Sequence, residues 1–297
     1  MNTAHPSSLQ DQAVLVLGLG QSGLAMARWC SEQGARVWVM DTRAEPPGLA
    51  DLHTHAPQAQ FIAGAFDPSL LAAQGIRAVF KSPGLSPTEV APVWRAAIEA
   101  GLWVGTELSL FVHALRETQD QAGYAPQVLA ITGTNGKSTV TTLVGQMVEA
   151  AGLPVCIGGN LGTPALDLLG SAAPAHYVLE LSSFQLETTH SLELAAAGVL
   201  NLSHDHMDRY ASMADYAAAK ARILRRCGTA VINADDPWTA AMPSPGQRRL
   251  SFSIDEGVAA DYRLSRDPAS GEDWLHAQGE RLLPTSELRL AGLHNAA

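Results

Sequence analysis

The sequence contains few cysteines, few charged residues and no long hydrophobic run. No segment approaches the ~20 consecutive apolar residues of a membrane-spanning helix. The first residues, 1–8, lack the basic and apolar regions of a signal peptide. The three cysteines, Cys30, Cys156 and Cys227, are widely spaced, which predicts free thiols in a reducing compartment. We therefore expect a cytoplasmic protein that does not insert into membranes.

Basic residues are outnumbered by acidic ones. The chain has 19 Lys and Arg against 29 Asp and Glu, for a net charge of −10. This balance argues against nucleic acid or an anionic membrane as the main partner, because both bind clustered cations. A polyanionic substrate must therefore be held by backbone amides and a few basic side chains. The length of 297 residues and the apolar content of 46% suit two packed α/β domains.

Residues 128–140 predict a buried strand, a Gly-rich turn and a helix. The apolar run 128–131 is typical of a central parallel strand, and apolar residues recur at helical spacing after Lys137. Gly133 and Gly136 allow backbone N–H groups and the helix N-terminus to converge on a phosphate. Ile131 stands where the P-loop pattern has glycine. Nucleotide binding is the favoured interpretation, and a Gly-rich structural turn is the alternative.

The side chains that follow this turn fit nucleotide chemistry. Lys137 would reach the outer phosphates, and the hydroxyl of Ser138 or Thr139 would ligate Mg²⁺.

An earlier segment, residues 13–28, has the pattern of a Rossmann-like strand, turn and helix. Its turn contains Gly18, Gly20 and Gly23, and the next strand ends at Asp41. NAD is the obvious ligand, but a UDP-sugar also carries a diphosphate. Thr42 and Arg43 add a hydroxyl and a cation beside the ribose position, and residues 81–87 form a second Pro/Gly turn. On this domain alone, both ligands remain open.

The polar segment after residue 115 predicts a domain boundary. We expect a Rossmann-like domain over residues 1–115, a linker over 116–127 and a P-loop-type, mainly parallel α/β domain over 128–297. Apolar runs at 177–181, 197–202 and 229–233 predict the later strands. Functional residues of such a domain gather after the carboxyl ends of its strands.

That rule selects several candidates in the second domain. Glu180 lies in an apolar run, where either a bound cation or a Lys or Arg partner would offset the cost of burial. The segment 204–208, His-Asp-His-Met-Asp, supplies an imidazole ligand or a charge relay, or is a solvated loop, and it lacks the further ligands of a zinc site. Lys220 lies in an Ala-rich helix one turn after Tyr216, and taken alone it predicts a solvated lysine. The Gly/Asn loop 158–162 either contacts substrate or turns the chain.

Seven motifs in this order resemble the Mur ligases, a family of ATP-dependent amide ligases of peptidoglycan synthesis. They are Leu17–Gly23, Lys81–Gly84, Thr132–Thr139, Gly159–Gly162, Leu179–Glu187, Asp205–Tyr210 and Tyr216–Lys220. The resemblance implies that the first domain holds a UDP-sugar, so NAD is no longer favoured. It also implies that Ile131 is ordinary in this family's phosphate loop.

The resemblance further implies a reaction and its cofactors. It indicates a ligase that adds D-glutamate to UDP-N-acetylmuramoyl-L-alanine, with ATP and two Mg²⁺ ions. The substrate carboxylate attacks the γ-phosphate, and the amine of glutamate then displaces phosphate from the acyl phosphate. Lys137 and the cations would neutralise the charge that accumulates there. The alternatives are a neighbouring Mur ligase that uses another amino acid, an inert nucleotide-binding fragment and, more weakly, an NAD-dependent oxidoreductase.

The resemblance implies roles for individual residues, which fall into four sets. The catalytic set is Lys137, Glu180, His206 and Lys220, and the metal ligands are Ser138, Glu180, His206 and a carbamylated Lys220. The ATP-binding set is Gly133, Thr134, Asn135, Gly136, Lys137, Ser138, Thr139 and Asn295. The substrate-binding set is Gly20, Gln21, Ser22, Asp41, Thr42, Arg43, Pro83, Gly84, Asn160 and Ser182.

The chain departs from the family in length. The family has a third, C-terminal domain that follows the motif containing Asn295. From this departure we expect a fragment of the enzyme that binds nucleotides but ligates poorly.

Overall fold

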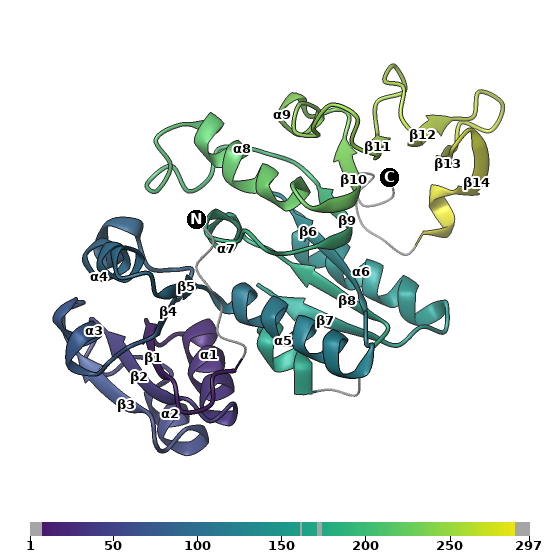
Figure 1. The fold of residues 1–297 in the computed structure, drawn as a ribbon. Helices are drawn as coiled ribbons and strands as arrows, with labels where there is room; N and C mark the ends of the chain where they lie inside the picture. Colours follow the sequence, from purple (N-terminus) through teal and green to yellow (C-terminus); the bar gives the residue numbers. More distant parts are fainter. Residues whose placement is uncertain (1–7, 161, 171–173, 289–297) are drawn as a thin grey trace. The chain divides into compact units, whose positions relative to one another are not determined.

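The computed structural model describes residues 8–160, 162–170 and 174–288 (Figure 1). The chain divides into two compact units. Unit 1 comprises Met1–Tyr124, Pro164–Ala172 and Thr188–His190, and unit 2 comprises Ala125–Thr163, Ala173–Glu187 and Ser191–Ala297.

The described part of unit 1 contains a five-stranded parallel sheet in the order β3-β2-β1-β4-β5. Its strands are β1 (Ala13–Leu17), β2 (Arg36–Asp41), β3 (Gln60–Ala63), β4 (Ala78–Lys81) and β5 (Trp103–Gly105). Its helices are α1 (Gln21–Glu32), α2 (Leu49–His55), α3 (Ser69–Ala73), α4 (Pro87–Glu99), α5 (Glu107–Ala122) and the 3₁₀ helix η1 (Ala165–Gly170).

Strand β1 is buried along its whole length, as the apolar run predicts. Leu15 and Leu17 belong to a core cluster that also contains Trp38 of β2 and Val79 of β4. Helix α1 begins directly after the glycine turn, and a Cβ at Gly23 would lie 1.9 Å from the Gly18 carbonyl oxygen. Glycine at this position therefore lets the helix approach the turn. The Rossmann-like prediction for this part of the chain is confirmed.

The described part of unit 2 contains a nine-stranded sheet in the order β14-β13-β12-β11-β10-β9-β6-β8-β7. Its strands are β6 (Gln127–Thr132), β7 (Val155–Gly159), β8 (His176–Glu180), β9 (Leu194–Val199), β10 (Cys227–Asn233), β11 (Arg249–Ser253), β12 (Tyr262–Arg266), β13 (Asp273–Ala277) and β14 (Glu280–Pro284). Its helices are α6 (Lys137–Ala150), α7 (Ser183–Glu187), α8 (Met213–Ala221), α9 (Pro237–Ala240) and the 3₁₀ helices η2 (Arg222–Leu224) and η3 (Thr285–Glu287).

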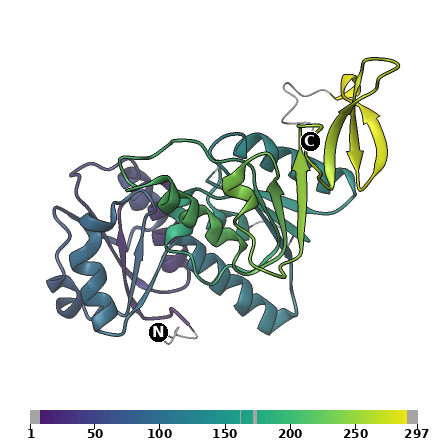
Figure 2. The same cartoon turned by 90° about the horizontal axis from the view of Figure 1, so that it is seen from above.

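The sheet of unit 2 is mainly parallel, as predicted. Strands β6 to β12 pair in parallel, whereas β12, β13 and β14 pair antiparallel and form the yellow end of the sheet (Figure 2). Helix α6 packs against β6, β7 and β8 (Figure 1). Strand β6 lies between β8 and β9, so the loops that follow these three strands open at the same edge of the sheet.

The structure differs from the predictions at two boundaries. Residues 116–122, predicted as linker, are the last two turns of α5, and the two units divide after Tyr124. The apolar run 197–202 predicted a strand over those residues, whereas β9 runs from Leu194 to Val199. The strand therefore begins three residues earlier than predicted and ends three residues earlier. No helix among the described residues is long and apolar enough to cross a membrane.

Candidate functional site

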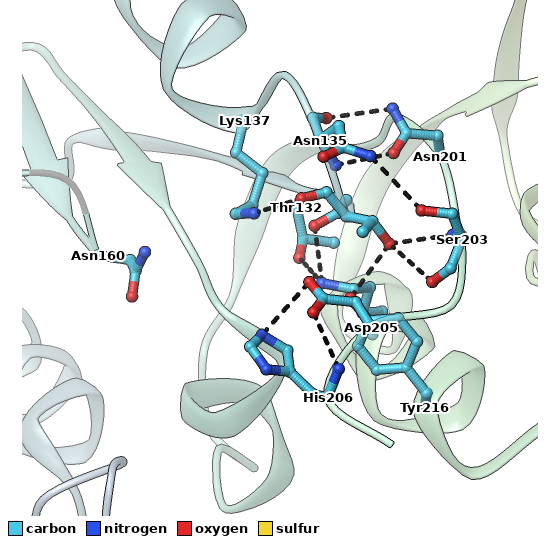
Figure 3. Close-up of polar contacts among 12 residues, drawn as sticks. Thr132, Asn135, Lys137, Asn160, Asn201, Ser203, Asp205, His206 and Tyr216 are labelled. Carbon is cyan, nitrogen blue, oxygen red and sulfur yellow. Dashed lines mark hydrogen bonds and ion pairs between the residues drawn. The ribbon is translucent and has the colours of Figure 1, made fainter. Parts of the chain in front are cut away.

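The phosphate loop of unit 2 connects β6 to α6. Gly136 has a φ of 79° and caps α6, a left-handed conformation that favours glycine. The loop is held by Asn201, which follows β9. Its Oδ1 accepts from Asn135 N at 2.9 Å and its Nδ2 donates to the Asn135 carbonyl at 3.1 Å (Figure 3). The predicted residues 133–139 therefore form one loop at the start of α6, braced by the neighbouring strand.

Lys137 lies at the first position of α6, and its side chain folds back over the loop. Its Nζ donates to the Thr134 carbonyl at 2.9 Å (Figure 3). The ammonium thus lies at the mouth of the loop, where the outer phosphates of a nucleotide would arrive.

Glu180 ends β8 and is 2% exposed. Its Oε2 accepts from Ser138 Oγ at 2.7 Å and its Oε1 accepts from Asn160 Nδ2 at 2.8 Å. A Cβ at Gly159 would lie 2.4 Å from the Glu180 carbonyl oxygen, so glycine brings the Asn160 loop against β8. These two hydrogen bonds come from neutral groups and not from a Lys or Arg, so they favour the bound-cation interpretation of Glu180 over the ion-pair interpretation.

Ser182 and His206 follow β8 and β9, the two strands that flank β6. Ser182 follows β8, and its hydroxyl contacts the side chain of Gln185 at 3.1 Å. His206 follows β9 in a left-handed conformation, with a φ of 54°. Its Nε2 lies 3.6 Å from Asp205 Oδ2, and its ring lies 4.8 Å from that of Phe184.

Lys220 is 2% exposed, so the prediction of a solvated helix lysine was wrong. Helix α8 carries the residue inward, and its Nζ donates to the Gly133 carbonyl at 2.8 Å. Burial, and then the neighbouring Lys137, lower the pKa of Lys220 to about 7. Alanines lie on both sides of Lys220 in the sequence, so the sequence pattern did not indicate which face of the helix packs against the protein core.

Tyr216 links α8 to the phosphate loop. Its hydroxyl lies 3.1 Å from Thr134 Oγ1, which also accepts from Ser203 N at 3.1 Å. The Tyr216 ring lies 4.8 Å from Lys220 Nζ. Sequence reasoning assigned no contact role to Tyr216 or to Asn201. Asn201 was hidden because the predicted strand ran to residue 202, whereas β9 ends at Val199 and leaves Asn201 after the strand. Nothing local assigns a contact to Tyr216.

The donor set near the phosphate loop fits a hard cation. Among the described residues, no three His, Cys, Asp or Glu side chains group together as ligands. Glu180 Oε2 and Ser138 Oγ nevertheless lie 2.7 Å apart. Both are oxygen atoms, the ligand type that Mg²⁺ prefers.

A cavity of about 400 Å³ opens beside the glycine turn of unit 1. It contains every substrate-binding residue predicted for the first domain. The lining residues are Gly18, Gly20, Gln21, Ser22, Asp41, Thr42, Arg43, Ser82, Pro83, Gly84 and Leu85. The N-terminus of α1 faces this group of residues through Gly20 and Gln21, which suits an anionic ligand.

Asp41 is already engaged within this cavity. Its Oδ2 accepts from Leu19 N at 2.7 Å, and both carboxylate oxygens accept from the Arg43 guanidinium at 2.8 Å. The Arg43 hydrogen bonds are the main reason that the pKa of Asp41 is lowered to about 2. The residue therefore holds Arg43 and the glycine turn in place, in addition to any contact with a ribose. Asn295, predicted to contact adenine, lies outside the described residues.

Family models match most of the chain. The model described as Mur ligase middle domain matches residues 131–297, and the model described as Mur ligase MurD-like, N-terminal domain, matches residues 12–105.

Named relatives and solved structures agree with these matches. UDP-N-acetylmuramoylalanine–D-glutamate ligase from Albidiferax ferrireducens is 45% identical, over 98% of this chain and 64% of the relative. The protein of the same name from Methylobacillus flagellatus is 47% identical, over 97% of this chain and 61% of the relative. This chain thus spans a little under two thirds of these relatives.

Two solved structures share the fold. UDP-N-acetylmuramate–alanine ligase MurC from Thermotoga maritima has a TM-score of 0.54 at 21% identity, covering 96% of this chain and 62% of that one. UDP-N-acetylmuramoyl-L-alanyl-D-glutamate–2,6-diaminopimelate ligase has a TM-score of 0.56 at 23% identity, covering 89% of this chain and 54% of that one. Because the middle-domain model alone matches more than half of the residues, the chain belongs to the Mur ligase family.

Proposed function

We propose that this chain is the UDP-sugar- and ATP-binding part of an ATP-dependent, ADP-forming ligase. The ligase would add D-glutamate to UDP-N-acetylmuramoyl-L-alanine in peptidoglycan synthesis. The observation that carries the proposal is the buried Glu180, which is bonded to Ser138 of the phosphate loop and to Asn160. The names of the two relatives described above support the choice of substrate.

Each unit takes one nucleotide in this proposal. The cavity of unit 1 receives the uridine diphosphate, with the N-terminus of α1 facing the diphosphate and Arg43 supplying the cation. The phosphate loop of unit 2 receives ATP, with Lys137 released from the Thr134 carbonyl to bind the outer phosphates. Unit 1 therefore binds the UDP-sugar and unit 2 binds ATP, with the first division between them after Tyr124 rather than across a linker.

The reaction requires a carboxylate to approach a polyanionic phosphate. Mg²⁺, when bound, would neutralise part of this charge. Glu180, Ser138, His206 and a carbamylated Lys220 would hold it at two sites. The chain's own contribution is to keep Lys137 near the transferring phosphate, while Asn160 and Ser182 orient the substrate carboxylate at the end of β8.

Lys220 is suited to carbamylation. A lowered pKa leaves much of its amine neutral near pH 7, and only a neutral amine attacks CO₂ to form the N–C bond with loss of a proton. Its position beside Gly133 would place the new carboxylate at the phosphate loop.

Calorimetry of this chain with Mg²⁺ tests the proposal. Titration with UDP-N-acetylmuramoyl-L-alanine should give tighter binding than UDP-N-acetylmuramate, and NADH should give none. A non-hydrolysable ATP analogue should bind, and Lys137→Ala should weaken that binding about tenfold or more, because a charge-assisted contact to phosphate is lost. Arg226→Ala, an exposed cation of the same unit, is the control. Binding of NADH without either UDP-sugar would contradict the proposal.

A further inference from the structure

The loop that carries His206 also carries Arg209, and the backbone ties the two residues together. Arg209 N and Tyr210 N donate to the His206 carbonyl at 3.0 and 3.1 Å. His206 itself has a φ of 54°, a left-handed conformation that is uncommon for a residue with a side chain. Because the turn is short and closed by these bonds, a displacement of Arg209 moves the backbone of His206.

Arg209 is anchored to helix α7. Its Nη2 donates to Glu187 Oε2 at 2.6 Å and its Nε donates to Glu187 Oε1 at 3.4 Å. The two side chains are only 9% and 20% exposed. Two contacts between a planar guanidinium and both oxygens of a carboxylate fix orientation as well as distance. Glu187 is the last residue of α7, and α7 begins three residues after Glu180.

Phe184 lies next to both the anchor and the imidazole. The Arg209 guanidinium carbon is 4.1 Å from the centroid of the Phe184 ring, and the His206 ring is 4.8 Å from it. Phe184 belongs to α7 as well. The His206 side chain is 45% exposed, and its imidazole contacts the Phe184 ring on one side and Asp205 Oδ2, at 3.6 Å, through Nε2. The Phe184 ring is therefore one of the contacts that restrain where the imidazole points.

We propose that Arg209 and Glu187 are positioning residues for His206. Through Phe184 and the turn 206–210, the ion pair holds the imidazole that follows β9 at a fixed place relative to the carboxylate that ends β8. The proposal rests on the proposed function only in that His206 and Glu180 serve there as magnesium ligands. The positioning itself is a property of the ligand-free chain.

The conservative substitution Arg209→Lys tests the positioning. It keeps the positive charge but removes the planar fork and the stacking on Phe184. Arg226→Lys is the matched control, because Arg226 pairs with Glu193 at 2.7 Å in the same unit with side chains 50% and 60% exposed. The first readout is the NMR signal of the His206 imidazole in the ligand-free chain, assigned by its loss in His206→Gln. The second is Mn²⁺ affinity by electron paramagnetic resonance with an ATP analogue present.

In Arg209→Lys we expect the His206 imidazole signal to shift and broaden and Mn²⁺ affinity to fall about three- to tenfold. UDP-sugar binding by unit 1 should be unchanged, and Arg226→Lys should change none of these readouts. Glu187→Gln and Phe184→Leu should move the same imidazole signal, so the test does not depend on one variant folding. An imidazole signal at its wild-type position in Arg209→Lys and Glu187→Gln would overturn the proposal. Failure of the wild-type chain to bind Mn²⁺ would contradict the proposed function, while the imidazole signal would still decide the positioning.

Discussion

Asp41 shows how a residue selected for ligand binding also holds its own turn together. Its pKa is lowered from 3.8 to about 2, mainly by Arg43. The Asp41 carboxylate therefore adds to the free energy of unfolding at pH values above its unfolded pKa of 3.8. This contribution is lost as the pH falls through 4 towards 2. Since the Arg43 side chain is 53% exposed, solvent screening reduces the contribution to about 1–2 kcal/mol.

Urea unfolding of the wild type and Asp41→Asn checks this assignment. The variant should lose about 1–2 kcal/mol of unfolding free energy at pH 6, and the difference between the two proteins should shrink by about half at pH 3. A difference that stays constant between these pH values would contradict the assigned pKa.

Cys30 is a residue whose chemistry is set by burial. Its side chain is completely buried in α1, and burial raises the pKa of its thiol. We expect a thiol reagent at pH 8 to modify Cys156 and Cys227, which are half-buried, well before Cys30. Peptide mapping after timed labelling measures this, and addition of urea should expose Cys30. Equal labelling of all three in the native protein would show that the packing around Cys30 opens readily.

Single residues also mark the limit of sequence-based prediction. The glycine turns, Lys137 and Glu180 could be identified because their chemistry is tied to local spacing. The burial of Lys220 and the pairing of Asn201 with Asn135 depend on which strands are neighbours, and sequence spacing does not contain that information.

At the scale of elements, the first residue of α5 connects segments distant in sequence. Glu107 is buried, its pKa is raised by that burial, and its Oε1 accepts from Leu166 N of η1 at 3.4 Å. The polar composition after residue 115 predicted a linker, because residues 116–120 of α5 are mostly exposed and carry little apolar periodicity. The helix persists there because its earlier turns, which include buried Leu108, Leu110 and Phe111, are packed.

Glu107→Ala should therefore loosen η1. The substitution removes the acceptor of a buried amide and leaves a void, and we expect a loss of about 1–3 kcal/mol of unfolding free energy. Glu107→Gln keeps the shape and an acceptor oxygen and should lose less. Urea unfolding provides the measurement, with Glu99→Ala, an exposed residue of α4, as a control within about 0.5 kcal/mol of the wild type. A loss no larger than that of the control would show that Glu107 does not hold η1.

At the scale of the whole molecule, the proposed function assigns one ligand site to each unit. Hydrogen exchange with mass spectrometry should therefore show two separate patterns of protection. UDP-N-acetylmuramoyl-L-alanine should slow exchange around residues 20–23 and 82–85, and an ATP analogue with Mg²⁺ should slow it around residues 133–139. Protection of the same unit by both ligands would contradict the assignment of one nucleotide to each unit.

The fold class of both units followed from the sequence, because their parallel strands are short apolar runs that alternate with helical patterns. Strands β3, β5, β7 and β11 were not among the predicted strands, and neither were the last three, β12, β13 and β14. The last three are five residues each, rich in charged side chains and only partly buried, so their pattern resembles that of loops.

The segments Pro164–Ala172 and Thr188–His190 belong to unit 1 although they follow the start of unit 2. The chain therefore changes unit five times, after residues 124, 163, 172, 187 and 190. During synthesis, the first 124 residues are made before η1, the segment whose Leu166 and Leu168 are buried in the folded protein. Unit 1 can complete its contacts only after His190 has been made, and neither a single protease cut nor a simple gene truncation would yield it intact.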